Sequence, residues 1–287
     1  MGPFLFMTPT LIIMGAGNSS RYGRLKQFEK IGIQNSYLLE FGIYDAIKAG
    51  FGKVVFIIQK EYKKYLSELS ENIKDKIKVE YVFQEVGSLP EQYSNVKRTK
   101  PWGTAHAIWC CKKEIEGPFT IINADDFYGE TSYKTLYENL IKEEESYYMV
   151  GYTLENTLSE NGSVNRGICS FNSDNYLENI KEEIGISNFS THEKDTIVSM
   201  NMWGFQSNFI SHLNEELELF LKENINNESK EFFIPMVVNK LIKGGKEKVK
   251  VLQSNEKWIG MSYKEDKLSV ELSLENKNYP KNLWRKY

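Results

Sequence analysis

A short stretch that follows the first apolar run combines small residues with cationic ones. It reads MGAGNSSRYGRLKQ and begins directly after Leu11, Ile12 and Ile13. Glycines let a backbone approach an anion closely, and successive N–H groups form an anion-binding nest. Hydroxyl groups, a guanidinium and an ammonium then add donors to phosphate oxygens. The stretch therefore predicts a phosphate cradle made of Gly15, Ala16, Gly17, Asn18, Ser19, Ser20, Arg21 and Lys26.

The cradle matches neither of two common phosphate-binding motifs. GxxxxGK[ST] is absent, and GxGxxG fails because residue 20 is serine. On local composition alone, an ordinary turn with surface cations is an equally good interpretation.

Two later segments favour the nucleotide interpretation. TKPWGTAHAI (99–108) places Gly103 and Thr104 at the start of a predicted helix, where a glycine lets a flat nucleobase lie against the backbone. INADDFYG (122–129) places Asp125 and Asp126 at the end of a predicted strand. Ligands of open α/β sheets bind at that edge, and a carboxylate beside phosphates suggests Mg²⁺. Helix capping or a turn is the structural alternative for the two aspartates.

The elements that must position these residues alternate along the chain. Apolar runs predict buried strands over 11–14, 53–59, 79–84 and 119–123, and helices over 38–49, 61–72 and 104–113. This order predicts an α/β fold with a Rossmann-like, mostly parallel sheet and helices on both faces. Beyond about residue 150 we predict strands over 148–153, 168–171 and 197–205 and helices over 209–224 and 233–243, with Asn/Ser-rich stretches at 155–166 and 185–195.

The simplest organisation is one domain, 1–287, without internal repeats. Residues 1–150 form the nucleotide-binding half, and 151–287 form a more irregular half with the C-terminal helices.

Composition excludes several classes of protein. The 287 residues are 41% hydrophobic and 26% charged, which is ordinary for a globular protein. A net charge of −3 gives no global basic field for a nucleic-acid partner. The three cysteines, Cys110, Cys111 and Cys169, form no CxxC, so neither a disulfide framework nor a zinc site follows. They fit a reducing cytoplasm, and no membrane-spanning run or signal peptide is evident. The oligomeric state stays open.

These motifs, taken in order, resemble the sugar-1-phosphate nucleotidyltransferases, or nucleoside-diphosphate-sugar pyrophosphorylases. The family's leading motif, a strand followed by G-x-G-[ST]-R and then a lysine, is similar to GAGNSSR followed by LKQF. The run RYGRLKQ resembles a bacterial subgroup described only as nucleotidyltransferases. Further similar stretches are RTKPWGTAHA, INADDFYG, TLSENGSVNRG, DTIVSMNMWGF and WIGMSYKED, so the resemblance spans almost the whole chain. It implies the nucleotide-diphospho-sugar transferase fold, with residues 151–287 as the sugar-binding half, and an EC 2.7.7 type activity.

The resemblance assigns roles to single residues. Arg21 would hold the nucleotide phosphates, and Lys26 would stabilise charge in the transition state. Gln84 would read the base edge, Gly103 would lie against the base, and Asp125 would bind the metal. On the acceptor side the resemblance places Asp126, Arg166, Gly167 and Asn201. Surface, bulge and turn roles are the structural alternatives for Gln84, Gly167 and Asn201 respectively.

The chain departs from the family at two points. Ser19 stands where the family loop has a glycine, and the segment EFFIPMVVN (231–239) lacks the late metal-binding aspartate expected there. Glu231 or Asn239 would have to substitute, or Mg²⁺ would rest mainly on Asp125.

The resemblance implies Mg²⁺-dependent transfer of a nucleotidyl group from a nucleoside triphosphate to a sugar-1-phosphate, with release of pyrophosphate. A glutamine amide can pair with a uracil edge through one donor and one acceptor, so Gln84 favours UTP or dTTP. The nucleophile is already an anion, so His106 is expected to have a structural role rather than to act as a general base.

Three alternatives stay open. The first is a cytidylyltransferase for a non-sugar phosphate such as phosphocholine. The second is a non-catalytic nucleotide-binding regulatory module, which Ser19 and the missing aspartate would suit. The third is a glycosyltransferase, which the adjacent rather than D-x-D spacing of Asp125 and Asp126 disfavours.

Overall fold

The computed structural model describes residues 8–17, 25–32, 35–93, 96–142, 146–261 and 263–284. Within these residues the centre of the molecule is a nine-stranded sheet in the order β10-β9-β11-β6-β1-β4-β5, and β8 pairs with both β11 and β12. Its strands are β1 (Thr10–Met14), β4 (Lys53–Ile58), β5 (Lys78–Phe83), β6 (Phe119–Asn123), β8 (Tyr147–Thr153), β9 (Val164–Phe171), β10 (Leu177–Ile186), β11 (Ile197–Phe205) and β12 (Val249–Ser254).

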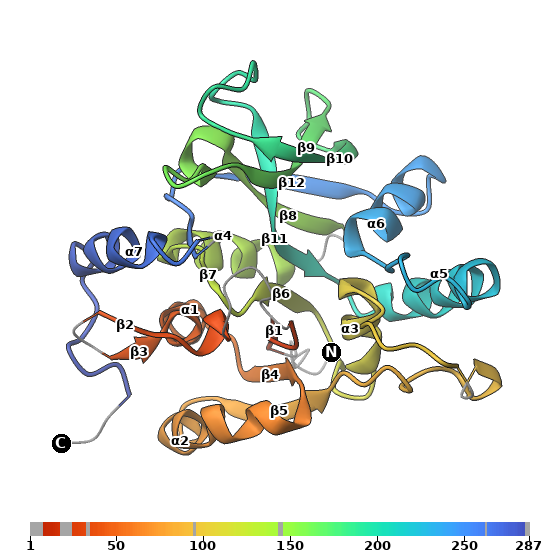
Figure 1. The fold of residues 1–287 in the computed structure, drawn as a ribbon, viewed down its shortest axis with the longest axis horizontal. Coiled ribbons are helices and arrows are strands. Elements are labelled where there is room, and N and C mark those ends of the chain that lie inside the picture. Colours follow the sequence, from red (N-terminus) through yellow and green to blue (C-terminus); the bar gives the residue numbers. More distant parts are fainter. Residues whose placement is uncertain are drawn as a thin grey trace, which may run out of the picture.

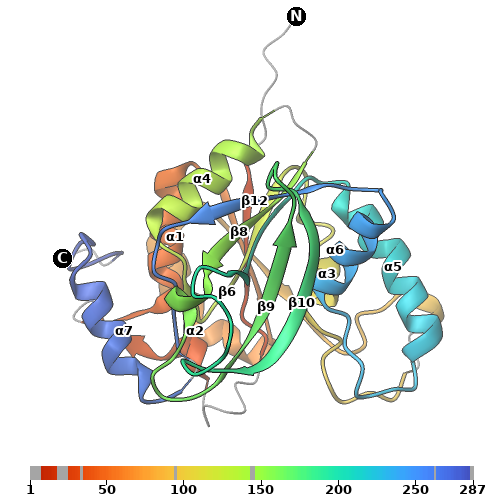
Figure 2. The ribbon, with the colours of Figure 1, turned by 90° about the horizontal axis from the view of Figure 1, so that it is seen from above.

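Helices cover both faces of this sheet. Figures 1 and 2 show α1, α4 and α7 on one side of the sheet and α3, α5 and α6 on the other. The helices are α1 (Leu38–Ala49), α2 (Lys63–Ile73), α3 (Thr104–Cys110), α4 (Glu130–Leu140), α5 (Phe209–Asn224), α6 (Ile234–Lys243) and α7 (Asp266–Glu275). Short 3-10 turns are η1 (Lys26–Phe28), η2 (Lys60–Tyr62), η3 (Glu91–Tyr93) and η4 (Leu154–Thr157). None of the described helices combines the length and apolar composition needed to cross a bilayer.

The first half of the sheet is parallel, and this brings several strand ends together. β1 pairs in parallel with β4 and β6, and β4 pairs in parallel with β5. The last residue of β1, Met14, lies opposite Ile57 of β4 and Asn123 of β6. The segments that leave β1, β4 and β6 therefore begin at one edge of the sheet, which is where open α/β sheets bind ligands.

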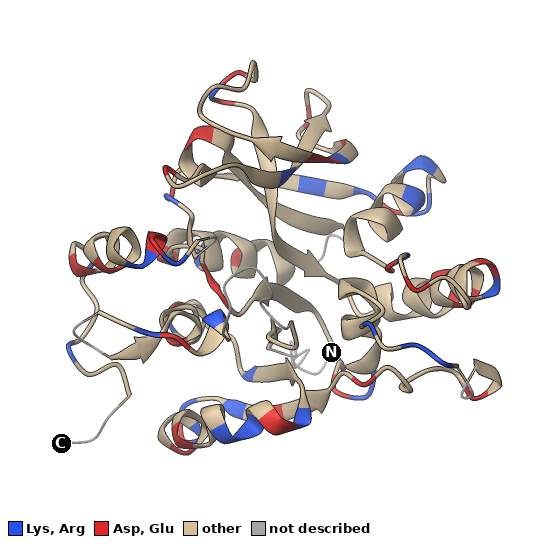
Figure 3. Ribbon diagram, in the orientation of Figure 1, with Lys and Arg blue, Asp and Glu red and all other residues tan. Residues whose placement is uncertain are grey.

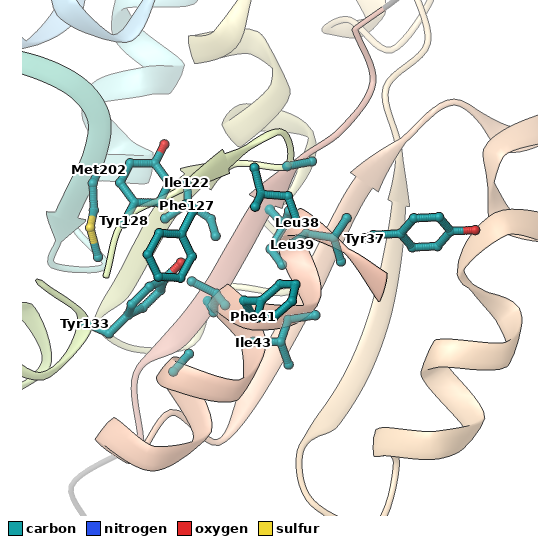
Figure 4. Close-up of a cluster of buried hydrophobic side chains, with 14 of the residues drawn as sticks. Tyr37, Leu38, Leu39, Phe41, Ile43, Ile122, Phe127, Tyr128, Tyr133 and Met202 are labelled. Carbon is teal, nitrogen blue, oxygen red and sulfur yellow. The ribbon is translucent and has the colours of Figure 1, made fainter. Parts of the chain in front are cut away.

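Alternating side chains of the strands feed two buried clusters, one on each face. On β1, Leu11 and Ile13 belong to one cluster and Ile12 to the other. Figure 4 shows part of the first cluster, where Phe41 of α1 lies near Phe127 and Tyr133. Because successive strand residues point to opposite faces, a run of apolar residues is needed when both faces are covered.

The structure confirms the predicted fold class. The helices 38–49 and 209–224 and the strands 119–123 and 197–205 have the predicted bounds. Beyond the parallel half the sheet is mixed, because β11 runs antiparallel to β6, β8 and β9.

The prediction missed four long elements, α4, β10, β12 and α7. β10 (LENIKEEIGI) is half-exposed and charged, so its apolar residues are too few to indicate a strand. The strand β9 also begins at Val164, inside the stretch expected to be irregular.

Two small two-stranded sheets complete the fold. β2 (Lys30–Ile31) pairs with β3 (Ser36–Tyr37). β7 (Asp126–Phe127) pairs antiparallel with β13 (Ile259–Gly260), so the segment after β6 is joined to a strand near residue 260.

Candidate active site

A pocket of about 530 Å³ opens at the edge where β1 and β6 end. We call it the edge pocket. Its lining comes from the glycine turn after β1, from η1, from the ends of β4 and β6, and from the start of α3. The lining residues are Met14, Gly15, Ala16, Gly17, Lys26, Gln27, Ile57, Gln84, Pro101, Gly103, Thr104, Ala107, Asn123, Asp125 and Glu231.

The glycine turn begins as a direct continuation of β1. The backbone N–H of Gly15 donates to Ile57 O at 2.8 Å, which keeps the turn attached to β4. A Cβ at Gly15 would lie 3.3 Å from the Ala124 side chain, whereas a Cβ at Gly17 would meet nothing within 4 Å. Gly15 is thus closely packed against Ala124, and Gly17 faces open space in the pocket wall.

Two glutamines that the sequence analysis did not single out hold this turn. Gln27 Nε2 donates to the carbonyls of Gly15 and Gly17 at 3.1 and 2.9 Å. Gln59 Nε2 donates to Ala16 O at 2.8 Å. In a trans peptide the N–H points away from the carbonyl, and the described residues contain no cis peptide bond. The N–H groups of Ala16 and Gly17 therefore point away from Gln27 and Gln59 respectively.

Lys26 and Asp125 meet in the lining of the pocket. The Lys26 Nζ forms an ion pair with Asp125 Oδ2 and donates to Met261 O at 3.2 Å. The two side chains are 27% and 19% exposed, so both are partly shielded yet open to a ligand. The arrangement places an ammonium and a carboxylate side by side, next to the glycine turn.

Asp126 has a different environment from its neighbour. Its side chain is buried, and Oδ2 accepts from Asn123 Nδ2 at 2.8 Å and lies 3.1 Å from the Tyr128 hydroxyl. Burial, and then the adjacent charge of Asp125, raises the pKa of Asp126 to about 7. Asp126 is not part of the pocket lining, so the structure separates the two aspartates into an accessible and a buried one.

The opposite end of the pocket is formed by Gly103 and Gln84. Gly103 has φ +109°, and a Cβ there would lie 2.6 Å from Phe232 O, so no other residue fits. Phe232 N donates to Trp102 O at 2.6 Å, and Ala105 N donates to Phe232 O at 2.9 Å. These two hydrogen bonds hold Phe232 in place, and the preceding residue, Glu231, lines the edge pocket.

Gln84 and Thr104 add polar atoms at this end. Gln84 Nε2 donates to Gly103 O at 3.1 Å and lies 3.3 Å from His106 Nδ1. Thr104 Oγ1 accepts from Ile234 N at 3.2 Å, which ties α3 to α6. His106 is fully buried, so it has no path to a substrate in the pocket.

None of the four residues predicted on the acceptor side, Asp126, Arg166, Gly167 and Asn201, lines the edge pocket. Arg166 is buried; it donates from Nε to Thr157 Oγ1 at 3.0 Å and lies over the Trp258 ring. Burial lowers the pKa of Arg166 to about 10. Gly167 packs against Ile180, where a Cβ would approach to 2.9 Å.

Asn201 is connected to the site through a hydrogen-bond chain. The Tyr128 hydroxyl, which contacts Asp126, donates to Met200 O at 2.8 Å, directly before Asn201. Asn201 has φ +61° at an irregularity of β11 between Ser199 and Trp203.

The remaining predictions concern four residues of the phosphate cradle and the two candidates that would substitute for the late aspartate. Asn18, Ser19, Ser20 and Arg21 lie outside the described residues. Of the two substitutes for the late aspartate, Glu231 lines the edge pocket, whereas Asn239 exchanges hydrogen bonds with the backbone of Ile180 at 2.9 and 2.6 Å. Asn239 therefore joins α6 to β10.

Comparisons with solved structures show the same fold. An inositol-1-phosphate CTP transferase from T. maritima has a TM-score of 0.64 at 13% identity, covering 91% of each chain. A protein assigned as a glucose-1-phosphate thymidylyltransferase from Bacillus anthracis, in complex with a sucrose, has a TM-score of 0.69 at 13% identity, covering 96% of this chain and 99% of that one. A UDP-glucose pyrophosphorylase with UDP-glucose has a TM-score of 0.65 at 15% identity, covering 94% and 99%.

Sequence comparison identifies the family. No curated protein matches the sequence. A family model described as "Nucleotidyl transferase" matches residues 12–261, from β1 to the residue that follows β13, and so includes the whole edge pocket. The chain belongs to the nucleotidyl transferase family and is a nucleotidyltransferase of the EC 2.7.7 type.

Proposed function

We propose that this protein transfers a nucleotidyl group from UTP or dTTP to a sugar-1-phosphate, forming an NDP-sugar and pyrophosphate. The observation that carries the proposal is the Lys26–Asp125 pair, which lines one pocket together with the glycine turn and Gly103. A volume of about 530 Å³ is within the range of pockets that enclose small organic ligands. The base would occupy the end formed by Gln84 and Gly103, and the phosphates would run along the glycine turn.

The reaction is a single displacement. An oxygen of the sugar-1-phosphate forms a bond to the α-phosphorus, the bond from that phosphorus to the bridging oxygen breaks, and pyrophosphate leaves with the electron pair. The nucleophile is an anion, so no proton has to be removed. Lys26 would neutralise charge on the transferred phosphate, and the N–H groups of Ala16 and Gly17 would bind oxygens of the leaving group.

The charges of the pocket support a requirement for Mg²⁺. Its described lining carries one cation, Lys26, and two carboxylates, Asp125 and Glu231. A triphosphate would be repelled by this lining unless a further cation entered with it. Asp125 and the amide of Asn123 are hard oxygen donors, which fit an ion that takes one or two protein ligands and completes its shell with phosphate and water. Bound there, Mg²⁺ would polarise the phosphate oxygens.

The acceptor side of the proposal uses Asp126, Arg166, Gly167 and Asn201 as the walls of a sugar subsite behind Asp125. The hydrogen-bond chain from Asp126 through Tyr128 to Met200 supports this arrangement. We place the reaction in the cytoplasm, which the three unpaired cysteines favour.

Cytidylyl transfer is the second candidate function. One structural neighbour is a CTP transferase acting on inositol-1-phosphate, which makes a CTP-dependent reaction with a non-sugar phosphate compatible with this fold.

A pyrophosphate-release assay tests both candidates. UTP, dTTP, CTP, ATP and GTP are each combined with a panel of sugar-1-phosphates, inositol-1-phosphate and phosphocholine, with Mg²⁺ or with EDTA. We expect Mg²⁺-dependent release with UTP or dTTP and one sugar-1-phosphate. Release with CTP and a non-sugar phosphate would select the second candidate, and binding without release under any combination would contradict both.

A further inference from the structure

We infer that His106 is a positioning residue that fixes the side-chain amide of Gln84, so that its oxygen, and not its nitrogen, is offered to the nucleobase. The inference rests on the proposed function, because it needs a nucleotide base at the Gln84 end of the edge pocket.

The orientation of the His106 ring is set by the backbone. His106 Nε2 lies 2.6 Å from Ser88 O, and a carbonyl can only accept, so Nε2 carries the hydrogen. The ring is fully buried, and burial lowers the pKa of His106 to about 4. The imidazole is therefore neutral, and its second nitrogen, Nδ1, has no hydrogen and must accept.

The Gln84 amide then has only one favourable orientation. Its Nε2 has two hydrogens, and two acceptors face it: Gly103 O at 3.1 Å and His106 Nδ1 at 3.3 Å. Turning the amide over would place Oε1 against both acceptors, which is repulsive at each contact. Both N–H groups are thus engaged, and Oε1 receives no hydrogen bond from the described residues. The sequence predicts that the Gln84 amide pairs with uracil through one donor and one acceptor. Because both N–H groups are engaged, only the acceptor Oε1 remains for the base.

This acceptor discriminates between pyrimidines at the N3 position of the base. Uracil and thymine carry a hydrogen on N3, whereas cytosine has a lone pair at N3 that would face Oε1 unfavourably. A fixed Oε1 therefore favours a keto pyrimidine. Ser88, His106 and Gln84 form a chain in which a backbone carbonyl outside the pocket determines which base the pocket accepts.

Two substitutions of His106 separate this role from a purely structural one. In His106→Gln the terminal amide can still donate to Ser88 O, but no acceptor takes the place of Nδ1, so Gln84 loses one of its two anchors. In His106→Asn the side-chain oxygen takes the place of Nδ1, but the donor to Ser88 is lost.

The experiment measures binding of UTP and CTP with Mg²⁺ by calorimetry, without an acceptor, alongside the melting temperature. We expect wild type to prefer UTP and to bind N3-methyl-UTP at least roughly 10-fold more weakly, because the N3 donor is gone. His106→Gln should lower the UTP:CTP preference by roughly 3- to 10-fold, which is the range for one hydrogen bond, with little loss of melting temperature. His106→Asn should keep the UTP:CTP preference of wild type and lower the melting temperature.

Each contrary result has a distinct meaning. An unchanged UTP:CTP ratio in His106→Gln, or a ratio that follows the melting temperature in both variants, would overturn the positioning role. A hydrogen on Nδ1 in ¹⁵N NMR of the wild-type protein would overturn it without any ligand. Failure of the wild-type protein to bind any of UTP, dTTP or CTP would instead overturn the proposed function, and the base selection with it.

Discussion

At the scale of single residues, the pair formed by Lys26 and Asp125 is the centre of the proposed chemistry. Each side chain is held by the other and remains partly open to the pocket. We expect Asp125→Asn to reduce kcat/KM by roughly 100-fold or more, because the variant loses a metal ligand and leaves Lys26 without its carboxylate. Pyrophosphate release measured against Mg²⁺ concentration checks this.

The melting temperature is the control for this substitution, because it reports whether the fold is retained. Asp125 is at the pocket surface, so the melting temperature of Asp125→Asn should stay close to that of wild type. An active variant with an unchanged Mg²⁺ dependence would remove Asp125 from the metal site.

Gln27 lines the edge pocket and supports the proposed phosphate cradle by binding its carbonyls. Gln27→Glu replaces the amide donor with a carboxylate. The carboxylate repels the carbonyl oxygens of Gly15 and Gly17, so the glycine turn is displaced. We expect KM for the nucleotide to rise roughly 10-fold or more, while the UTP:CTP preference stays unchanged because that preference arises at the other end of the pocket. Steady-state kinetics with two nucleotides separates the effects.

A matched glutamine serves as the control. Gln253→Glu, at an exposed position of β12, introduces the same charge outside the pocket and should leave KM unchanged. Equal KM values for all three proteins would mean that the cradle does not depend on Gln27.

At the scale of elements, β11 contains a bend that coincides with a predicted substrate contact. Asn201 has φ +61°, a conformation that asparagine tolerates and glycine adopts freely. Asn201→Gly should therefore keep the melting temperature within a few degrees of wild type, yet raise KM for the sugar phosphate if the amide contacts it. Asn175→Gly, at φ +63° in the β9–β10 turn, is the matched control and should leave KM unchanged. An unaffected KM in Asn201→Gly would limit Asn201 to shaping the strand.

The helix α1 carries a buried acid that links stability to pH. Asp45 is fully buried, and its Oδ2 accepts from the Tyr279 hydroxyl at 2.7 Å. Burial is the main cause that raises the pKa of Asp45 from 3.8 to about 7. The folded state then binds more protons than the unfolded state, so the free energy of unfolding falls as pH rises from about 4 to about 7.

Asp45→Asn should remove this pH dependence. The variant keeps an acceptor for Tyr279 and should be more stable than wild type at pH 8, by up to roughly 4 kcal/mol, with the difference vanishing near pH 4. Urea unfolding at several pH values measures it. Asp75→Asn, at an exposed turn, is the control and should not change the slope. A wild-type slope that persists in Asp45→Asn would assign the dependence to other groups.

At the scale of the whole molecule, local pattern predicted the layers and strand ends but not the distant contacts. The runs around Ile12, Val55 and Ile121 indicate buried strands because both faces of the sheet are covered. The same logic placed Gly15, Gly103 and Asp125 at one edge. The pattern did not predict β10, because its exposed charged residues resemble those of a loop. It also did not predict the roles of Gln27 and Gln59, because a glutamine that binds a backbone carbonyl has no sequence signature.

The surroundings of the residues on the acceptor side could not be predicted from local sequence pattern either. Whether Arg166 faces a sugar or the carbonyl of Thr157 depends on how η4 and β9 pack, which adjacent residues do not reveal. Figure 3 shows Lys, Arg, Asp and Glu interspersed over the ribbon, so the distribution of charge does not mark that side either.

The pairing of β7 with β13 bears on how the enzyme is made. Lys26 donates to Met261 O across 235 positions of the chain, and Gly260 lies opposite Asp126. During synthesis on the ribosome the first half of the sheet can form early, but the pocket lacks this support until β13 has left the exit tunnel. A nascent chain should therefore bind nucleotide weakly until then. Ribosome-arrested chains ending before and after β13, compared for nucleotide binding, would show the step, and tight binding by the shorter chain would refute it.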